Sequence, residues 1–418
     1  MADELKDIYH LFNPDKALLN DELGKYYVEI DQNEINIKEL QIRLQLGLET
    51  REPIKLLFTG HRGSGKSTAL NRLILKLPSD FFIVKYNVLD LLDQNDVTYI
   101  DVLLSVLTKL FERAKEDKVE LGDSLSRRAD EWSSSITKTT ISEKGKGLEL
   151  KAKIPFYLLE IMGRIKNEST TRVEIRKRIE PRVSELISLI NDTIAEIEKH
   201  GKQVLIIIDN LEKIESDNAL KLFYDHGTQL TQPICKIIYT FPISLKSSNI
   251  FSQIKMNFSD VCFHPNIKIH EEKGSEYPYE KGRDFMKEIV SKRVSQDLFE
   301  PDALDYILDM SGGVVREFIR IIRDSSIRAL TRGKITIDKD IAIDVVNGLK
   351  NLYQAQLSDS DYDVLREVYK TKDIKRDDKL VNLLHNLSVL EYRNGRSWCD
   401  LNPVVRSILN EKGMLKQV

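Results

Sequence analysis

The sequence contains little cysteine and no long apolar segment. Its three cysteines, Cys235, Cys262 and Cys399, lie far apart without a CxxC pair, so neither a disulfide framework nor a thiolate zinc site is expected. No uncharged apolar run approaches the roughly 18 residues that a membrane helix needs, and the chain does not begin with a basic region followed by an apolar one. These absences predict a cytoplasmic protein that is neither exported nor membrane-spanning.

The chain also lacks a strong excess of either charge. Its 63 Lys and Arg residues against 66 Asp and Glu residues give a formal net charge of −3. This balance excludes a protein whose whole surface wraps nucleic acid, but it leaves room for one local basic patch. The 418 residues predict two or three domains, and the 41% hydrophobic fraction is ordinary for a globular chain with a sizeable buried core.

A complete G-x-x-x-x-G-K-[ST] motif follows a short apolar run at residues 54–59 and precedes a segment with helical spacing of leucines. It consists of Gly60, His61, Arg62, Gly63, Ser64, Gly65, Lys66, Ser67 and Thr68. Glycines let backbone N–H groups converge on a phosphate, Lys66 bridges the β- and γ-phosphates, and the Ser67 hydroxyl can ligate Mg²⁺. The alternative is a glycine-rich turn that merely precedes a helix, but the full motif and its flanks favour a site for ATP and Mg²⁺.

Five short apolar runs predict a sheet. They occupy residues 54–59, 81–88, 204–208, 236–240 and 266–269. Their hydrophobicity is continuous rather than alternating, which is typical of parallel strands covered by helices on both faces. The predicted fold class is therefore α/β, a P-loop doubly wound parallel sheet.

Four residues at predicted strand ends are candidates for chemistry. Asp209 follows the run 204–208 and is expected to hold Mg²⁺ through water, although a strand-end Asp is often only a helix cap. Asn210 comes next, and its amide cannot accept a proton at neutral pH, so the general base is either Glu212 or absent. Thr240 is placed to touch the γ-phosphate or the attacking water, or else to satisfy nearby backbone.

More than a hundred residues separate the second and third runs, which predicts an insertion at about 115–200. A 3.6-residue period predicts one long helix over 172–199, and alternating residues predict a β-hairpin within 136–154. Residues 138–182 contain twelve Lys and Arg against six Glu. This basic stretch is a candidate DNA contact, but its lysines equally fit a solvated hairpin that blocks edge pairing.

The remainder of the chain is expected to be mostly helical. Candidate helices occupy residues 284–294, 302–310, 314–329, 362–369 and 378–387. An Asn394-Gly395 pair between two short apolar runs then predicts a β-hairpin, followed by a helix from about Pro403. This order describes a winged helix. The predicted domains are a P-loop ATPase domain at 1–281, a helical lid at 282–355 and the winged helix at 356–418.

Together these features resemble an AAA+ P-loop ATPase of the origin-recognition or STAND-like type, in which a helical lid and a C-terminal winged helix follow the ATPase. The resemblance covers about residues 10–412 without the insertion. It rests on the phosphate motif, Asn87 at the second strand end, Asp209, Thr240 and the Ser-Gly-Gly-Val-Val-Arg stretch at 311–316. The resemblance implies that Arg316 reaches the γ-phosphate as a sensor of nucleotide state. Without the resemblance, Arg316 is simply a cation at a helix start, where the helix dipole disfavours a positive charge.

The sequence departs from this family pattern in two places. Asn210 stands where AAA+ enzymes usually carry a catalytic glutamate, and no arginine occurs between Arg182 and Arg283, where an arginine finger would normally lie. Hydrolysis is therefore expected to be slow, or to borrow an arginine from the insertion or a partner, or to use Lys255.

The leading hypothesis is an ATP-binding, slowly hydrolysing switch in a DNA-linked or defence process. It would act as a homo- or hetero-oligomer, with a protein effector or with DNA bound through 138–182 or the winged helix. The 351–418 segment carries eleven Lys and Arg against ten Asp and Glu, so its charge does not choose between these partners. The alternatives are a scaffold that holds ATP without turnover and, disfavoured by the lid pattern, a P-loop kinase of small molecules.

Overall fold

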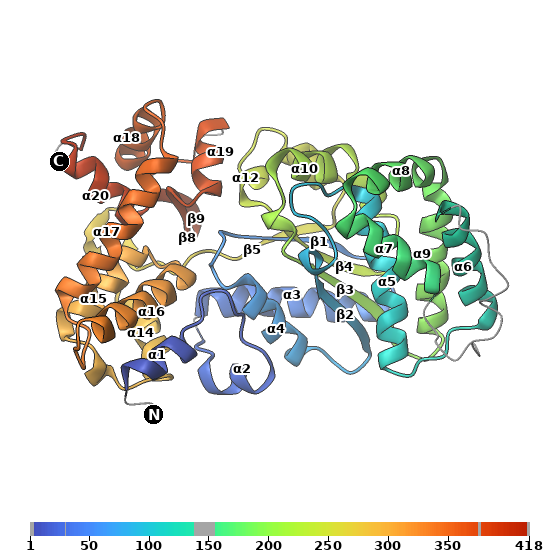
Figure 1. Cartoon of the computed structure of the whole chain (residues 1–418), viewed down its shortest axis with the longest axis horizontal. Coiled ribbons are helices and arrows are strands. Elements are labelled where there is room, and N and C mark those ends of the chain that lie inside the picture. Colours follow the sequence, from blue (N-terminus) through green and yellow to red (C-terminus); the bar gives the residue numbers. More distant parts are fainter. Residues whose placement is uncertain (1–3, 30, 138–154, 375–377, 416–418) are drawn as a thin grey trace.

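The structure is a computed structural model that describes residues 4–29, 31–137, 155–374 and 378–415. A five-stranded sheet forms its centre (Figure 1), in the order β2-β3-β4-β1-β5, and every neighbouring pair is parallel. The strands are β1 (Lys55–Thr59), β2 (Phe81–Asn87), β3 (Gln203–Asp209), β4 (Lys236–Phe241) and β5 (Asp260–Phe263). The predicted α/β class with a parallel P-loop sheet is confirmed.

Four of the five predicted strands are present, and the fifth prediction was wrong. The apolar run 266–269 lies outside the sheet, while the edge strand β5 is formed by residues just before it. Three of the four β5 residues are only partly buried, so this strand has no continuous apolar pattern. Ile267 and Ile269 are apolar because they pack into the core of the C-terminal helices instead.

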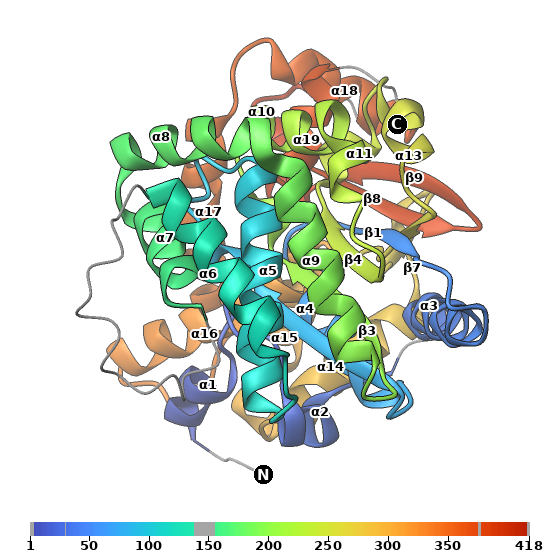
Figure 2. The ribbon, with the colours of Figure 1, turned by 90° about the vertical axis from the view of Figure 1, so that its right-hand side faces the viewer.

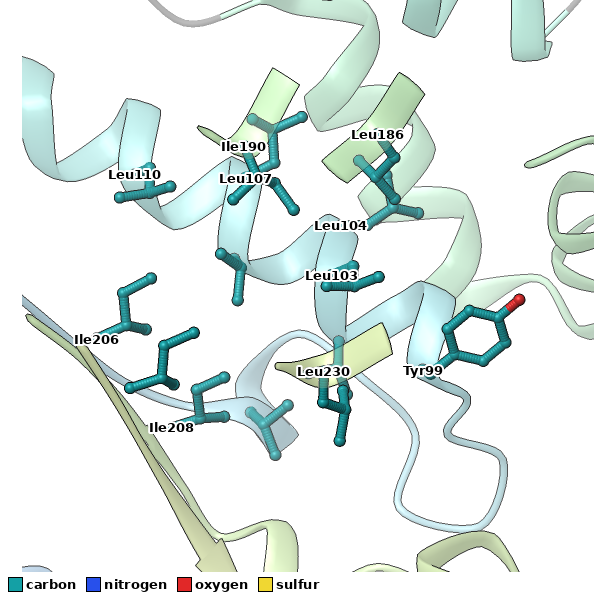
Figure 3. Packing of buried hydrophobic residues seen from close by; sticks show 14 of the residues in the cluster. Tyr99, Leu103, Leu104, Leu107, Leu110, Leu186, Ile190, Ile206, Ile208 and Leu230 are labelled. Atoms are coloured by element: carbon teal, nitrogen blue, oxygen red, sulfur yellow. The ribbon is translucent and has the colours of Figure 1, made fainter. Parts of the chain in front are cut away.

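Both faces of the sheet are covered because alternate strand residues point in opposite directions. Leu205 and Ile207 of β3 pack with α3 (Asp31–Thr50) and α4 (Lys66–Lys76). Ile206 and Ile208 point the other way, towards α5 (Tyr99–Glu116) and α9 (Val183–Glu198), as Figure 3 shows. In Figure 2, α5 and α9 run side by side across the near face. This double cover explains the continuous apolar runs.

The insertion is helical where it is described. Its helices are α6 (Asp123–Thr137), α7 (Phe156–Asn167) and α8 (Ser169–Ile179). The single helix predicted over 172–199 was wrong: a 3-10 turn at Glu180–Arg182 separates α8 from α9. Pro181 lies in this turn, and proline removes a helical N–H and crowds the preceding turn. Most of the predicted hairpin, 138–154, lies outside the described residues, and Ile136 and Thr137 end α6.

The C-terminal half contains the helices predicted from the sequence. They are α14 (Glu280–Ser291), α15 (Pro301–Ser311), α16 (Val315–Thr331) and α17 (Lys339–Gln356). The predicted helix, helix, hairpin, helix order follows as α18 (Asp361–Thr371), α19 (Asp378–His385), β8 (Val389–Asn394), β9 (Arg396–Leu401) and α20 (Pro403–Glu411). A separate small hairpin pairs β6 (His270–Glu271) with β7 (Gly274–Pro278).

Short helices complete the structure. They are α1 (Leu5–Leu11), α2 (Asn20–Tyr26), α10 (Ser216–Leu220), α11 (Gly227–Leu230), α12 (Ile243–Lys246) and α13 (Phe251–Met256). Helix α1 packs against α16 rather than against the sheet (Figure 1), and Leu5, Ile8 and Phe12 belong to one apolar core with α14 to α20. The first residues of the chain therefore stabilise the C-terminal helices.

All three cysteines are free thiols. Cys235 precedes β4, Cys262 lies in β5 and Cys399 lies in β9. Among the described residues, none of the helices combines the length and apolar character needed to cross a bilayer.

Candidate functional site

The glycine-rich motif forms the loop between β1 and α4, at the carboxyl edge of the sheet. Gly65 precedes α4 with a φ of 99°, a left-handed conformation that a side chain would strain. Helix α4 begins at Lys66, so its N-terminal N–H groups face the loop. This is the arrangement in which backbone donors and a helix dipole bind an anion.

The Lys66 ammonium is buried and held by oxygen atoms. Its Nζ donates to the carbonyl oxygens of Gly60 at 2.9 Å and His61 at 2.8 Å, and lies 3.3 Å from Glu212 Oε1. Burial lowers the pKa of Lys66, and the Glu212 carboxylate opposes that effect. A phosphate anion entering this site would replace protein oxygens as the partner of Lys66.

Glu212 lies on a short 3-10 turn, Leu211–Lys213, directly after β3. Asn210 makes the bend possible with a φ of 69°, a left-handed conformation that asparagine tolerates better than most residues. Burial alone would raise the pKa of Glu212, but the Lys66 ammonium and the Thr240 hydroxyl more than offset this, so the pKa is lowered. The buried Oε2 has no hydrogen-bond partner among the described residues. Glu212 is therefore an ionised carboxylate with one oxygen available to a ligand or water.

The side chain of Thr240 lies near the same carboxylate. Its Oγ1 accepts from the Leu211 N–H at 2.9 Å and lies 3.2 Å from the Ile208 carbonyl oxygen. Thr240 thus fixes the turn that carries Glu212, which is the backbone role that the sequence left open beside a phosphate contact.

Asp209 is almost fully buried at the end of β3. Its Oδ2 lies 3.5 Å from Lys85 Nζ, and its Oδ1 accepts from the Asn210 N–H at 2.9 Å. The Asn210 amide in turn donates to Asn87 Oδ1 at 2.8 Å. Asn210 is therefore committed to linking the ends of β2 and β3.

A cavity of about 450 Å³ opens beside these residues. It is lined by residues 63–68, Asp209, Glu212 and Lys213, and also by the apolar or aromatic side chains of Tyr26, Val28, Phe285, Ile289 and Ile319. The N-terminal segment contributes to its wall: the Leu18 N–H donates to Thr68 Oγ1 at 3.2 Å, and Asn71 Nδ2 donates to the Leu18 carbonyl oxygen at 2.8 Å. A lining that combines polar and apolar side chains suits a phosphorylated ligand with an aromatic base.

Helix α16 closes the cavity from the other side. The Arg316 N–H donates to the Gly63 carbonyl oxygen at 3.0 Å, and Arg316 Nε donates to the Pro14 carbonyl oxygen at 3.1 Å. The turn before this helix packs directly against Ile267, and only a glycine fits there. Gly313 has a φ of 72°, and a Cβ at this position would lie 1.8 Å from the Ile267 carbonyl oxygen. The structure thus places Arg316 beside Gly63 of the phosphate motif, and its contact with a γ-phosphate stays a prediction.

The side chains of His61 and Arg62 lie outside the cavity, unlike the rest of the motif from Gly63 onwards. His61 Nε2 accepts from the Glu391 N–H of β8 at 2.7 Å, and burial together with the Lys66 charge lowers the pKa of His61 to about 3. Arg62 donates to the carbonyl oxygens of Glu212 at 3.4 Å and Lys213 at 3.2 Å. These two side chains hold the loop in place.

Several cavity residues were not identified from the sequence. Lys85, Asn71, Lys213, His264 and the segment around residues 10–28 all line it. One feature of the sequence could have pointed to Lys85: it is a charged residue within an apolar strand. No sequence feature pointed to the N-terminal segment, since its position depends on the packing of α1 against α16.

The residues present fit a magnesium ion bound together with phosphates. Ser67 and the buried Asp209 line the same cavity and offer hydroxyl and carboxylate oxygens, the ligands that Mg²⁺ prefers. Within the described ranges, no group of three or more His, Cys, Asp or Glu side chains could hold a metal ion alone. A metal here would therefore complete its coordination with water or with phosphate oxygens.

All five arginines between residues 164 and 182 are paired with carboxylates, some of which lie outside the insertion. Arg172 Nη1 lies 2.8 Å from Asp96 Oδ2, and Arg176 lies 2.6 Å from Asp96 and 2.5 Å from the buried Asp101. Further along the insertion, other arginines have carboxylate partners: Arg164 with Glu160, Arg178 with Glu174 and Arg182 with Glu185. Arg172 and Arg176 thus join α8 to the loop after β2 and to the start of α5, whereas the other three pair with residues three or four positions away.

Comparison with known proteins agrees with the phosphate motif. Residues 40–226 match the model of the KAP family P-loop domain, a stretch of less than half the chain that includes Lys66, Asp209 and Glu212. The chain is thus similar to that family over its P-loop NTPase domain. No significant sequence match was found among curated proteins.

Three solved structures illustrate the similarity in overall course. The Aeropyrum pernix ORC2 protein, described in ADPNP-ADP complexes, is 11% identical with a TM-score of 0.46, covering 97% of this chain and 98% of that one. A Walker-type ATPase of Pyrococcus abyssi is 13% identical with a TM-score of 0.49 (96% and 99%), and the Thermotoga maritima RuvB branch migration motor is 13% identical with a TM-score of 0.41 (97% and 100%). With TM-scores below 0.5, these similarities add nothing to the assignment of a function.

Proposed function

We propose that the protein binds ATP with Mg²⁺, hydrolyses it slowly to ADP and phosphate, and acts as a nucleotide-dependent switch. One observation carries this proposal: residues 63–68 of the phosphate loop, the carboxylates Asp209 and Glu212, Arg316 of α16 and several apolar side chains all line one cavity. Its volume of about 450 Å³ lies within the range of small-ligand sites.

The phosphates would lie on the N-terminus of α4, with the γ-phosphate towards Glu212. Lys66 would leave the carbonyl oxygens of Gly60 and His61 and bind the phosphates. Mg²⁺ held by Ser67 and Asp209 would supply charge neutralisation at the phosphate oxygens. Glu212, ionised and freed from Lys66, would then accept a proton from the attacking water, which the Asn210 amide cannot do.

The base would lie against the apolar residues of the cavity. Tyr26 and Val28 of the N-terminal segment and Phe285 and Ile289 of α14 all line it. A bound nucleotide would therefore touch the sheet, the N-terminal segment and the lid together. Loss of the γ-phosphate would remove a partner of Arg316, so the ATP and ADP states would differ in how firmly α16 is held against Gly63.

The site assignment is tested by replacing Lys66. Lys66→Met should weaken ATP binding about ten- to a hundredfold, because a charged hydrogen bond to phosphate is lost. Affinity can be measured by isothermal titration calorimetry. The double variant Lys66→Met/Glu212→Gln serves as a folding control because it removes both buried charges; unchanged ATP affinity in a folded Lys66 variant would overturn the site.

A second candidate function is a scaffold that holds ATP without turnover. Two observations favour it: Asn210 replaces the usual catalytic carboxylate, and Glu212 is paired with Lys66 at 3.3 Å. Phosphate release distinguishes the two functions. Persistent absence of release from ATP-bound protein, with and without partners, would select the scaffold.

The remaining assignments stay predictions. They comprise the domain boundaries at 281 and 355, the winged-helix identity of 356–418, the STAND-like and defence assignments, oligomer formation and a DNA or protein partner. DNA contact through 138–182 is weakened by the paired arginines of α8, and its lysine-rich part, 138–154, lies outside the described residues. Binding of duplex DNA that falls steeply with salt would support a DNA partner, and a mass measurement with and without ATP would test nucleotide-driven assembly.

A further inference from the structure

Lys85 is a cation in an otherwise apolar stretch of the central sheet. It lies on β2, opposite Ile207 of β3. Its neighbours Val84 and Tyr86 point to the other face of the sheet and pack into the core. Its side chain is only 19% exposed, and its Nζ lies 3.5 Å from Asp209 Oδ2. Placing a lysine there costs solvation, which the contact with Asp209 partly offsets.

The ammonium group is also held from the phosphate-loop helix. Lys85 Nζ donates to Oδ1 of Asn71 on α4, and Asn71 Nδ2 donates to the Leu18 carbonyl oxygen at 2.8 Å. Lys85, Asn71 and Asp209 all line the cavity that contains Ser67. A polar chain thus runs from the N-terminal segment through Asn71 and Lys85 to Asp209, and it ends where Mg²⁺ would be held.

From this geometry we propose that Lys85 is a positioning residue that competes with Mg²⁺ for Asp209. The inference rests on the proposed ATP site and adds a property of its metal. Without metal, Lys85 neutralises the buried carboxylate and fixes its orientation. A divalent cation held by Asp209 would lie close to the ammonium group and be repelled by it, because charges at this separation interact strongly in a partly buried site.

The site would consequently need a higher Mg²⁺ concentration before the metal strengthens nucleotide binding. Metal entry would require the Lys85 ammonium to withdraw from Asp209 towards Asn71, its other partner. A purely structural role makes a different prediction, because a lysine that only stabilises the fold would not change the metal requirement of nucleotide binding.

The test is the Mg²⁺ dependence of nucleotide affinity in the full chain. Binding of a fluorescent ATP analogue is titrated at a series of MgCl₂ concentrations, with EDTA as the metal-free point. Lys85→Met removes the charge at similar length, and Lys85→Gln does so while keeping a hydrogen-bond donor for Asp209. Lys202→Met is the matched control, because Lys202 is exposed at the opposite end of β3.

We expect both Lys85 variants to reach half-maximal metal enhancement at a Mg²⁺ concentration about tenfold or more below that of the wild type, while Lys202→Met stays unchanged. An unchanged or increased Mg²⁺ requirement in either folded Lys85 variant would overturn the proposal. If Lys85→Met fails to fold, Lys85→Gln carries the same prediction.

A separate measurement distinguishes this proposal from the proposed function. The thermal midpoint of nucleotide-free protein is recorded with and without MgCl₂. Mg²⁺ should stabilise Lys85→Gln more than the wild type, and the double variant Lys85→Gln/Asp209→Asn should lose that gain. If the wild type binds no ATP analogue, the proposed function fails, and this metal-only arm still decides the role of Lys85: equal Mg²⁺ shifts in the three proteins overturn it.

Discussion

At the residue scale, the pair formed by Lys66 and Glu212 defines the resting site. Both side chains are at least 95% buried, and each satisfies part of the other's charge. Removing one partner alone would leave an uncompensated buried charge, which costs more than removing both. Under the proposed function, the base Glu212 and the phosphate-binding Lys66 would therefore stay in contact until a ligand separates them.

Replacing the base tests its role in hydrolysis. Glu212→Gln should lower the rate of phosphate release by about 10²- to 10⁴-fold, since a positioned general base contributes that much, while ATP still binds. Single-turnover phosphate release and calorimetry measure the two quantities. Glu215→Gln is a control on the same segment, at an exposed position; wild-type rates in Glu212→Gln would refute a catalytic role.

Individual site residues differed in how well the sequence could identify them. The motif from Gly60 to Thr68 and Asp209 follow local patterns, because a strand, a turn and a helix N-terminus are encoded by neighbouring residues. Lys85 and Asn71 could not be assigned, since their meeting depends on how β2 and α4 cross. Nor could the sequence show that the Thr240 hydroxyl fixes the Leu211 N–H.

At the element scale, ion pairs join the insertion to the loop after β2 and to the start of α5. Arg172 and Arg176 of α8 contact Asp93, Asp96 and Asp101, which lie in and after the loop that follows β2. The sequence showed these arginines only as an excess of positive charge, because their acidic partners lie outside the basic stretch. Periodicity likewise predicted one helix where Pro181 separates two.

Breaking this network should destabilise the protein. Arg176→Met leaves the fully buried Asp101 carboxylate without its cation, which should lower the free energy of unfolding by about 3–5 kcal/mol. Lys177→Met, an exposed neighbour on the same helix, should change it by less than about 0.5 kcal/mol. Urea unfolding followed by circular dichroism measures both; equal effects would show that the network contributes nothing specific.

At the scale of the whole molecule, the phosphate loop is tied to the C-terminal hairpin. His61 accepts from the Glu391 N–H across 330 residues of sequence, and the Tyr392 hydroxyl donates to the Gly312 carbonyl oxygen at 2.6 Å. The same hairpin pairs Glu391 with Lys246 of α12. The phosphate loop, the turn before α16 and the C-terminal hairpin are thus in direct contact. No local pattern in the sequence could predict this contact.

This contact should make stability depend on pH. The pKa of His61 falls from its usual 6.5 to about 3 on folding, so the folded state is fully favoured above pH 6.5 and loses stability as the pH falls from 6.5 towards 3. The slope from one such group is at most about 1.4 kcal/mol per pH unit. His61→Gln keeps an acceptor without this titration and should show a shallower loss in urea unfolding.

The partly buried His385, whose pKa is lowered to about 4, should retain its own share of the pH dependence in the His61→Gln variant. A wild-type slope that is unchanged by His61→Gln would contradict the assignment of the neutral imidazole.

The three free thiols lie in separate regions of the fold, where chemical labelling can follow local opening. Burial raises the pKa of Cys235 and of Cys262 to about 12 and also raises that of Cys399. Cys235, before β4, and Cys399, in the C-terminal hairpin, are buried and should react slowly until their surroundings open, whereas Cys262 on the edge strand β5 is only partly buried. Labelling kinetics at Cys235 and Cys399 would therefore time the opening of two separate regions in unmodified protein, with Cys262 as a more accessible reference, and show which of them a nucleotide slows.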